Sequence, residues 1–263
     1  MRARRRFGQN FLHDRSIIRH INSTINASCA DHVVEIGPGH GELTTALAAS
    51  GCQLDLIEID RDLVSNLQDR FGGNDRVTIH EGDALKFDLP ALPRVAGAGP
   101  LRIVGNLPYN ISTPLLFRLF RHIDIIGDMT FMLQAEVVDR MAADRSTRAY
   151  GRLSIMTQYH CEAEKMFEVP PSAFTPQPKV TSAIVRLTPR HRATTAADTK
   201  LMETLLARAF SQRRKTVRNA LSQYLDEDEL SALDIDARAR PENLSVDEYV
   251  RCVNHVHVRD TAQ

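Results

Sequence analysis

Four consecutive residues, Asn106-Leu107-Pro108-Tyr109, follow an apolar run that ends at Gly105. The Asn106 side chain offers a carbonyl acceptor, and the backbone carbonyls around Leu107 and Pro108 offer a second, whose direction the proline ring restricts. Tyr109 offers a flat face on which a base can stack. Two acceptors beside such a face suit the exocyclic amine of an adenine. The alternative is a turn that Asn106 caps, with Tyr109 in the core.

A glycine-rich turn, residues 37–41, follows another apolar run, and Glu35 stands just before it. Glycines allow a ligand to approach the backbone closely at the start of a helix. Glu58 stands 19 positions after Gly39, where a carboxylate can accept hydrogen bonds from both hydroxyls of a ribose. These features alone fit a nicotinamide cofactor as well as another adenosine-containing one, and a tight turn that only needs small residues is the structural alternative.

Two further carboxylates favour one cofactor. Asp83 ends a third apolar run, and a carboxylate there can accept a hydrogen bond from an adenine amino group. Glu35 adds negative charge where the pyrophosphate of a dinucleotide would lie. The charge therefore favours a cationic cofactor, S-adenosylmethionine, and a methyl transfer to the amine held at Asn106.

The elements that position these residues alternate along the chain. Helical spacing or composition predicts helices over residues 14–25, 42–50, 61–71 and 113–123. Apolar runs predict strands within residues 32–41, 53–60, 76–85, 101–109, 129–134, 163–170 and 180–189. This alternation predicts an α/β fold with a mostly parallel sheet covered on both faces. Ligands bind outside the carboxyl ends of such strands, so the candidate residues are expected at one edge.

The chain divides into two expected domains. Residues 1–190 form the α/β domain, which begins with a basic arm carrying Arg2 and Arg4–Arg6 and contains a proline-rich loop at 170–179. Residues 190–199 are polar and are predicted to be a linker. Residues 195–263 show helical patterns and no strand pattern, so they are expected to form a small all-α domain.

Composition limits the other possibilities. The 263 residues carry 33 basic and 33 acidic side chains, and 43% are hydrophobic, enough for a sizeable core. The four cysteines are far apart and form no CxxC pair, which argues against zinc and against a disulfide framework. No apolar stretch approaches the ~20 residues that cross a bilayer, and the start lacks a secretory signal pattern. A cytoplasmic protein that binds no metal and no membrane is therefore expected.

Longer motifs carry a resemblance to a known family. The segments FGQNFL, VEIGPGHGELT, IEIDRDL, GDAL, GNLPYNISTPL, MLQAEVVDRM, YGRLS, VPPSAFTPQPKVTSAIVRL and FSQRRKTVRNAL resemble those of the ribosomal RNA adenine dimethyltransferases, from about residue 5 to 255. The resemblance implies a Rossmann-like, S-adenosylmethionine-dependent methyltransferase domain with a small helical C-terminal domain. It places the cofactor contacts on Asn10, Leu12, Gly37, Glu58, Asp83 and Asn106.

The same resemblance implies a substrate. Two adjacent adenosines in a hairpin loop near the 3′ end of small-subunit (16S) rRNA would be dimethylated at N6, late in small-subunit biogenesis, with S-adenosylhomocysteine as product. The partner would be an immature 30S particle, and the enzyme would act as a monomer. The target base must leave its stack to react, and Phe174 is the candidate for a second stacking face opposite Tyr109, with Phe11 next in line.

Binding to RNA requires local positive charge. On a helical wheel of the segment 210–221, Arg214, Lys215 and Arg218 share one arc, which is predicted to contact phosphates, whereas Arg213 falls on the apolar side. A solvated basic face is the alternative. Three other functions stay open: methylation of a large-subunit rRNA adenine, methylation of DNA adenine, and a role mainly as an assembly factor that binds the immature subunit.

Overall fold

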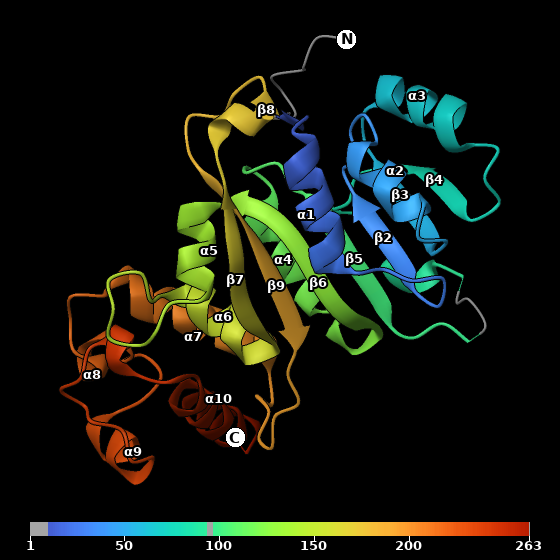
Figure 1. Ribbon diagram of the computed structural model, residues 1–263. Helices are drawn as coiled ribbons and strands as arrows, with labels where there is room; N and C mark the ends of the chain where they lie inside the picture. Colours follow the sequence, from blue (N-terminus) through green and yellow to red (C-terminus); the bar gives the residue numbers. More distant parts are fainter. Residues whose placement is uncertain (1–9, 94–96, 263) are drawn as a thin grey trace. The chain divides into compact units, whose positions relative to one another are not determined.

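The computed structural model describes residues 10–93 and 97–262, and these form two compact units (Figure 1). The first unit contains the described residues up to Val138 together with Glu162–Pro189. The second contains Asp139–Cys161 and the described residues from Arg190 onward. The basic arm, with Arg2 and Arg4–Arg6, lies outside the described residues. Among the described helices, none combines the length and the apolar composition that crossing a bilayer requires.

A seven-stranded sheet in the order β4-β3-β2-β5-β6-β9-β7 forms the centre of the first unit. Its strands are β2 (His32–Ile36), β3 (Gln53–Glu58), β4 (Val77–Glu81), β5 (Leu101–Asn106), β6 (Ile126–Gln134), β7 (Cys161–Val169) and β9 (Ser182–Pro189). Strands β2 to β6 pair in parallel, and β9 runs antiparallel to β6. The predicted α/β fold with a mostly parallel sheet is therefore confirmed.

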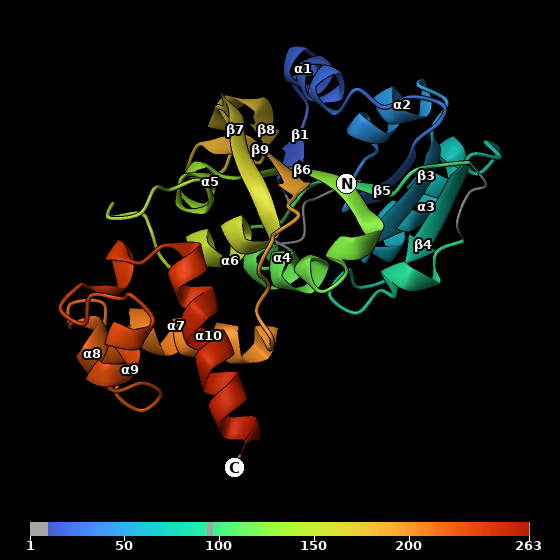
Figure 2. The same cartoon turned by 90° about the horizontal axis from the view of Figure 1, so that it is seen from below.

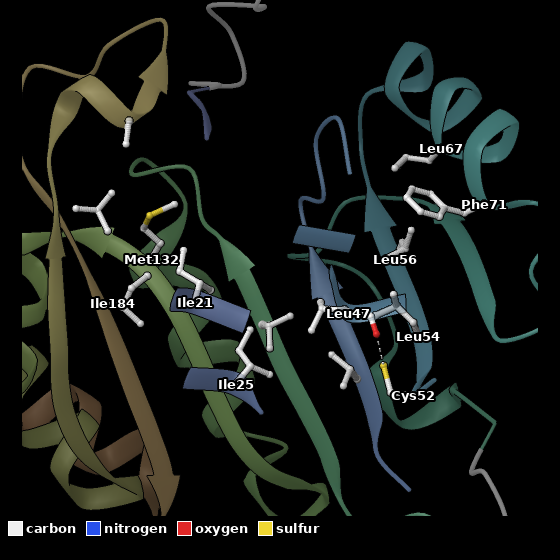
Figure 3. Close-up of a cluster of buried hydrophobic side chains, with 14 of the residues drawn as sticks. Ile21, Ile25, Leu47, Cys52, Leu54, Leu56, Leu67, Phe71, Met132 and Ile184 are labelled. Carbon is white, nitrogen blue, oxygen red and sulfur yellow. Dashed lines mark hydrogen bonds between the residues drawn. The ribbon is translucent and has the colours of Figure 1, made fainter. Parts of the chain in front are cut away.

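Helices cover both faces of this sheet. Helices α1 (Arg15–Ile25) and α2 (Glu42–Ala48) lie on one face, whereas α4 (Ser112–Phe120) lies on the other (Figure 2). Helix α1 begins at its N-cap Asp14, whose carboxylate accepts from the backbone of Ser16 and Ile17. A hydrophobic cluster gathers side chains from α1, α2, α3 (Arg61–Phe71) and the strands (Figure 3). This packing holds the parallel strands in register, so that β2, β3 and β5 end at a common edge.

Glycine is required where β5 reaches that edge. A Cβ atom on Gly105 would lie 2.5 Å from the backbone oxygen of Ile36, closer than van der Waals contact allows. The absence of a side chain therefore lets β5 approach β2 at the position immediately before Asn106.

Two short strands were not anticipated. Phe11–Leu12 (β1) pairs antiparallel with Phe174–Thr175 (β8), with Phe11 opposite Thr175 and Leu12 opposite Phe174. The backbone N–H of His13 extends this pairing by donating to Ala173, 3.0 Å away. Residues that were expected to form an arm and a proline-rich loop thus form a two-stranded sheet of their own.

The second unit is helical among its described residues from 195 onward, as predicted. Its helices there are α7 (Thr199–Ser211), α8 (Val217–Ala220), α9 (Glu227–Ala232) and α10 (Val246–Thr261). Helix α6 (Arg152–His160) also belongs to this unit, and α5 (Ala135–Met141) crosses the boundary between the units. Both helices were missed in the sequence. The short 3-10 helices of the two units are Leu89–Ala91, Ile123–Ile125, Pro171–Ala173 and Pro241–Asn243.

The unit boundary differs from the expected division at residue 190, because residues 139–161 pack with the C-terminal helices. The buried Tyr150 donates its hydroxyl to the carbonyl of Leu244, 3.1 Å away. The expected linker is also held within this unit. Arg192 donates to the backbone oxygens of Gln158 and Tyr159 and forms an ion pair with Asp247.

Candidate active site

A cavity of about 280 Å³ opens at the carboxyl edge of the parallel strands in the first unit. Nine residues that the sequence singled out line it: Asn10, Leu12, Gly37, Glu58, Asp83, Asn106, Leu107, Pro108 and Tyr109. Phe174 does not line the cavity. The fold therefore brings all the predicted cofactor residues together with the tetrapeptide that was predicted to hold an amine.

The glycine turn has the left-handed backbone that its composition implies, with φ values of 67° at Gly37, 61° at Gly39 and 78° at Gly41. Its three glycine N–H groups are engaged within the protein: Gly37 donates to Ile57, Gly39 to the Glu58 carboxylate and Gly41 to Pro38. These donors do not form a binding nest for a phosphate. The turn therefore serves to bring the backbone close to a ligand rather than to hold an anion.

Glu58 is buried at the end of β3 and is oriented by three backbone donors. Its Oε1 accepts from the N–H groups of Ile59 and Asp60, each at 2.9 Å, and its Oε2 accepts from Gly39 at 3.2 Å. Burial raises the pKa of this carboxyl above its ordinary value. A carboxylate oxygen can accept two hydrogen bonds, so Oε2 keeps acceptor capacity for a hydroxyl in the cavity.

Asp83 follows β4. As in Glu58, backbone N–H groups engage part of the carboxylate and leave the rest able to accept a hydrogen bond. Its Oδ1 accepts from the backbone N–H of Leu85 at 2.9 Å. This bond fixes the carboxylate and leaves Oδ2 as an acceptor on a half-buried side chain. Ile59, with 45% of its surface exposed, supplies an apolar wall to the same cavity. A flat heterocycle with an amino group fits such a pairing of apolar surface and acceptor.

Glu35 lies at the inner wall of the cavity and is only 2% exposed. The Thr44 hydroxyl donates to it at 2.7 Å, but burial outweighs this bond and raises the pKa of the carboxyl to about 7. The negative charge expected of Glu35 therefore depends on pH near neutrality. No lysine or arginine occurs among the described residues that line the cavity. A lining with carboxylates and without basic side chains suits a cation better than a pyrophosphate.

Asn106 has its side chain oriented by the N-terminal segment. Its Nδ2 donates to the backbone oxygen of Asn10 at 3.0 Å, which leaves Oδ1 as an acceptor. The carbonyls of Pro108 and Tyr109 accept from Ile111 and Ser112 at 3.1 Å each. A carbonyl oxygen has two lone pairs, so the Pro108 oxygen keeps acceptor capacity beside its bond from Ile111, and both carbonyls predicted as the second acceptor, Leu107 and Pro108, stay candidates.

The two aromatic candidates have different positions. Tyr109 is half-buried in the cavity wall, and its hydroxyl lies 2.7 Å from that of Ser182. Phe174 is 1% exposed and belongs to the buried cluster that also contains Met132 and Ile184. Figure 3 labels Met132 and Ile184. The backbone of Phe174 pairs with Leu12, a cavity-lining residue, so that Phe174 lies one layer behind the cavity. The structure does not place the two rings on opposite sides of the cavity.

The predicted basic arc in the second unit is not one helix. Helix α7 ends at Ser211 and α8 begins only at Val217, with Thr216 as its N-cap. Arg214 and Lys215 are exposed in the turn between them, and Arg218 is exposed but forms an ion pair with Glu227 at 2.6 Å.

Arg213, which the helical wheel placed on the apolar side, does not enter a helix. Its guanidinium donates to the backbone oxygens of Thr147 and Arg148 at 3.0 and 2.8 Å. Arg213 therefore fastens the turn between α7 and α8 to the 147–148 loop.

Two contacts at the site carried no signal in the sequence. The rings of Phe11 and His40 lie 4.2 Å apart, and a Cβ atom on Gly39 would meet Phe11 at 3.2 Å. Phe11, which the sequence offers only as an alternative stacking face, therefore covers the glycine turn. Ser182, the partner of Tyr109, is an ordinary serine at the start of an apolar run. The pairing of β1 with β8 holds Phe11 in the cavity lining, and the register of β9 brings Ser182 to Tyr109.

Comparisons with known proteins agree with this geometry. The family model described as Ribosomal RNA adenine dimethylase matches residues 1–257. Two relatives named Ribosomal RNA small subunit methyltransferase A come from Pseudomonas aeruginosa and Aromatoleum aromaticum. They are 51% and 52% identical over 256 residues, or 97% of this chain, and the alignments cover 95% and 94% of the relatives.

Two solved structures are similar across nearly the whole chain. A dimethyladenosine transferase from Plasmodium falciparum has a TM-score of 0.79 and 27% identity, covering 95% of this chain and 98% of that one. The 23S rRNA methyltransferase ErmE has a TM-score of 0.72 and 25% identity, covering 94% and 100%. With the family model spanning nearly its entire length, the chain belongs to the ribosomal RNA adenine dimethylase family.

Proposed function

We propose that this protein transfers methyl groups from S-adenosylmethionine to the N6 amines of two adjacent adenosines in small-subunit rRNA. The target lies in a hairpin loop near the 3′ end, and the reaction takes place on an immature 30S particle, late in its assembly. The observation that carries the proposal is the free Oδ1 of Asn106 beside the Leu107 carbonyl, in a cavity that also holds the acceptors of Glu58 and Asp83.

The residues of the cavity fit the cofactor. Oε2 of Glu58 would accept from the ribose, Oδ2 of Asp83 from the adenine amino group, and Glu35 would face the positive charge when ionised. Gly37, Asn10 and Leu12 would form the walls around it. S-adenosylmethionine supplies an activated methyl group when bound, and S-adenosylhomocysteine is the product.

The chain's own groups would act mainly by orienting the target. Asn106 Oδ1 and a backbone oxygen of Leu107 or Pro108 would accept the two N–H bonds of the adenine amine. Such acceptors favour a pyramidal nitrogen and stabilise the positive charge that develops on it. Tyr109 would stack on the extruded base. Phe174 is the proposed second face, which requires its ring to turn out of the adjacent core when the base enters.

RNA binding is proposed for the second unit. Arg214, Lys215 and Arg218 would contact phosphates, and because Arg213 holds the turn to the 147–148 loop, Arg214 and Lys215 are presented on a fixed backbone. We further propose that the protein acts as a monomer in the cytoplasm. A role mainly as an assembly factor would use the same surface, and methylation of a large-subunit adenine would use the same cavity.

Small ribosomal subunits that lack adenine dimethylation test the proposal. We expect the purified full-length protein to transfer radiolabelled methyl groups from S-adenosylmethionine to them, and mass mapping to find dimethyladenosine at two adjacent positions. Subunits already dimethylated and large subunits should accept none. Transfer to large subunits would indicate the alternative substrate, and binding without transfer would indicate the assembly factor.

A further inference from the structure

A buried serine touches the proposed stacking residue. The hydroxyl oxygens of Tyr109 and Ser182 lie 2.7 Å apart, a normal hydrogen-bond distance. Ser182 is the first residue of β9 and is 0% exposed. A buried hydroxyl without a partner is costly, so this bond accounts for a serine at a position that otherwise suits an apolar residue.

The backbone of Ser182 is firmly anchored. It lies opposite Gln134 in the β6–β9 ladder, and the carbonyl of the preceding Thr181 accepts from Ala135 at 3.0 Å. Strands β5, β6 and β9 are neighbours in the sheet (Figure 1). Ser182 therefore has a fixed position relative to β6, the strand that also borders the catalytic tetrapeptide.

The backbone of Tyr109 is anchored to the same strand. Leu107 donates its N–H to Met132 of β6 at 3.2 Å, and the Tyr109 carbonyl accepts from the Ser112 hydroxyl at 3.1 Å. These bonds hold the main chain, but they do not fix the χ1 torsion, which moves the whole ring about the Cα–Cβ bond. The hydroxyl lies at the far end of the ring, so a hydrogen bond there fixes where the ring lies.

We infer that Ser182 is a positioning residue, whose hydroxyl holds the Tyr109 ring at the place where it stacks on the target adenine. The inference rests on the proposed function. It also implies that Tyr109 offers the base its ring face while its hydroxyl is bonded to Ser182. Removing either hydroxyl should then have the same effect, and removing both should add nothing.

The test compares the parent with Tyr109→Phe, Ser182→Ala and the double variant on unmethylated small subunits. We expect each single change to lower the single-turnover methyl-transfer rate about 3- to 10-fold, the net contribution of one hydrogen bond. The double variant should be no slower than the slower single variant, since the two changes remove one interaction. The affinity for S-adenosylmethionine and the KM for subunits should stay at the parent values.

Ser154→Ala is the matched control, because Ser154 is also 0% exposed, its hydroxyl is bonded to the backbone of Arg140, and neither residue lines the cavity. It should lower the melting temperature without slowing transfer. Parent rates in Tyr109→Phe, or rate losses that multiply in the double variant, would overturn the inference. Tyr109→Phe keeps the test valid if Ser182→Ala does not fold. An inactive parent would instead refute the proposed function.

Discussion

The carboxamide nitrogen of Asn106 lies 3.0 Å from the backbone oxygen of Asn10, a residue 96 positions earlier in the chain. Because the backbone oxygen of Asn10 can only accept, the contact shows which end of the Asn106 amide is the nitrogen and which is the oxygen. The acceptor end of Asn106 is thereby turned away from the N-terminal segment. An N-terminal residue that resemblance alone associated with the cofactor thus also orients the group predicted to hold the target amine.

Substitutions at Asn106 should separate these two roles. Asn106→Ala should lower single-turnover methyl transfer at saturating cofactor by ~10²–10³, the usual effect of losing one preorganised polar group. Asn106→Asp keeps an acceptor but sets two oxygens against each other at Asn10, so an intermediate loss is expected. A parent-like rate in the aspartate variant would show that the contact with Asn10 does not orient the side chain.

Glu58 should control cofactor affinity. Glu58→Gln should weaken S-adenosylmethionine binding ~10- to 100-fold, because a hydrogen bond to a charged group contributes about 1.5–3 kcal/mol. Calorimetry measures the change, and Glu81→Gln is the control. Glu81 ends the neighbouring strand β4 but is exposed and pairs with Arg61 at 2.7 Å. Equal affinity in a folded Glu58→Gln protein would refute the ribose assignment.

Glu35 should make both stability and binding depend on pH. Its pKa in the folded protein is raised to about 7 from 4.5 by burial, so the stability linked to its protonation is present below pH 4.5 and is lost as pH rises through 7. A cationic ligand favours the ionised form, so S-adenosylmethionine affinity should increase over the same range.

Glu35→Gln should flatten both pH profiles and raise the melting temperature at pH 8 relative to the parent. The substitution retains an oxygen that can accept from Thr44, so the fold is preserved. Titration of binding between pH 6 and 8 provides the measurement. A parent-like slope in this variant would assign the dependence to Glu58, whose pKa is also raised by burial.

Phe174 should show whether the core next to the cavity opens for the base. Phe174→Leu keeps most of the buried apolar volume, so the melting temperature should change little. If the ring stacks on the base, methyl transfer should fall ~5- to 100-fold, equivalent to ~1–3 kcal/mol of stacking, with unchanged cofactor affinity. A normal transfer rate would restrict Phe174 to the core, and Phe11→Leu would then be the next variant to measure.

The basic turn of the second unit should contribute to RNA affinity unevenly. The pair Arg214→Gln and Lys215→Gln should reduce the salt slope of subunit binding by up to ~1.4, at ~0.7 per phosphate contact. Arg218→Gln should reduce it less, because Arg218 is already paired with Glu227. Glu227→Gln, which releases Arg218, should instead tighten binding. If all variants bind subunits with the same salt slope as the parent, these residues only form a solvated surface and do not contact RNA phosphates.

The sequence predicts the parallel sheet well, because most of its strands are buried apolar runs that end near a distinctive polar residue, and only β4 is half-buried or exposed along its length. Glu58, Asp83 and Asn106 could be placed at one edge because parallel strands share their carboxyl ends. The two-residue strands β1 and β8 have no pattern of their own and exist only through each other. The contact of Phe11 with the glycine turn could not be predicted for that reason. The role of Ser182 depends on the register of β9 with β6, which also joins positions far apart in the sequence.

Other features depend on burial and tertiary contacts that a pattern does not contain. Burial raises the pKa of Glu35 to about 7, and a spacing argument contains no information about burial. The helical wheel over 210–221 treats the segment as one helix, whereas α7 ends at Ser211, α8 begins at Val217, and Arg213 between them bonds to backbone oxygens of another loop. The polar segment 190–199 resembled a free linker, but Arg192 fastens it to Gln158 and Tyr159.

The pairing of Phe11–Leu12 with Phe174–Thr175 also determines when the cavity is completed. A chain is made from its amino terminus, so the first strand of this pair leaves the ribosome long before the second. It cannot pair until the second strand has also been made. Long loops close slowly compared with contacts between neighbours in sequence. A nascent chain that ends before Phe174 already contains β2 to β6, yet the wall formed by Phe11 and Leu12 has no strand to pair with. The ability to retain a ligand is therefore acquired late in synthesis, after most of the sheet has been made.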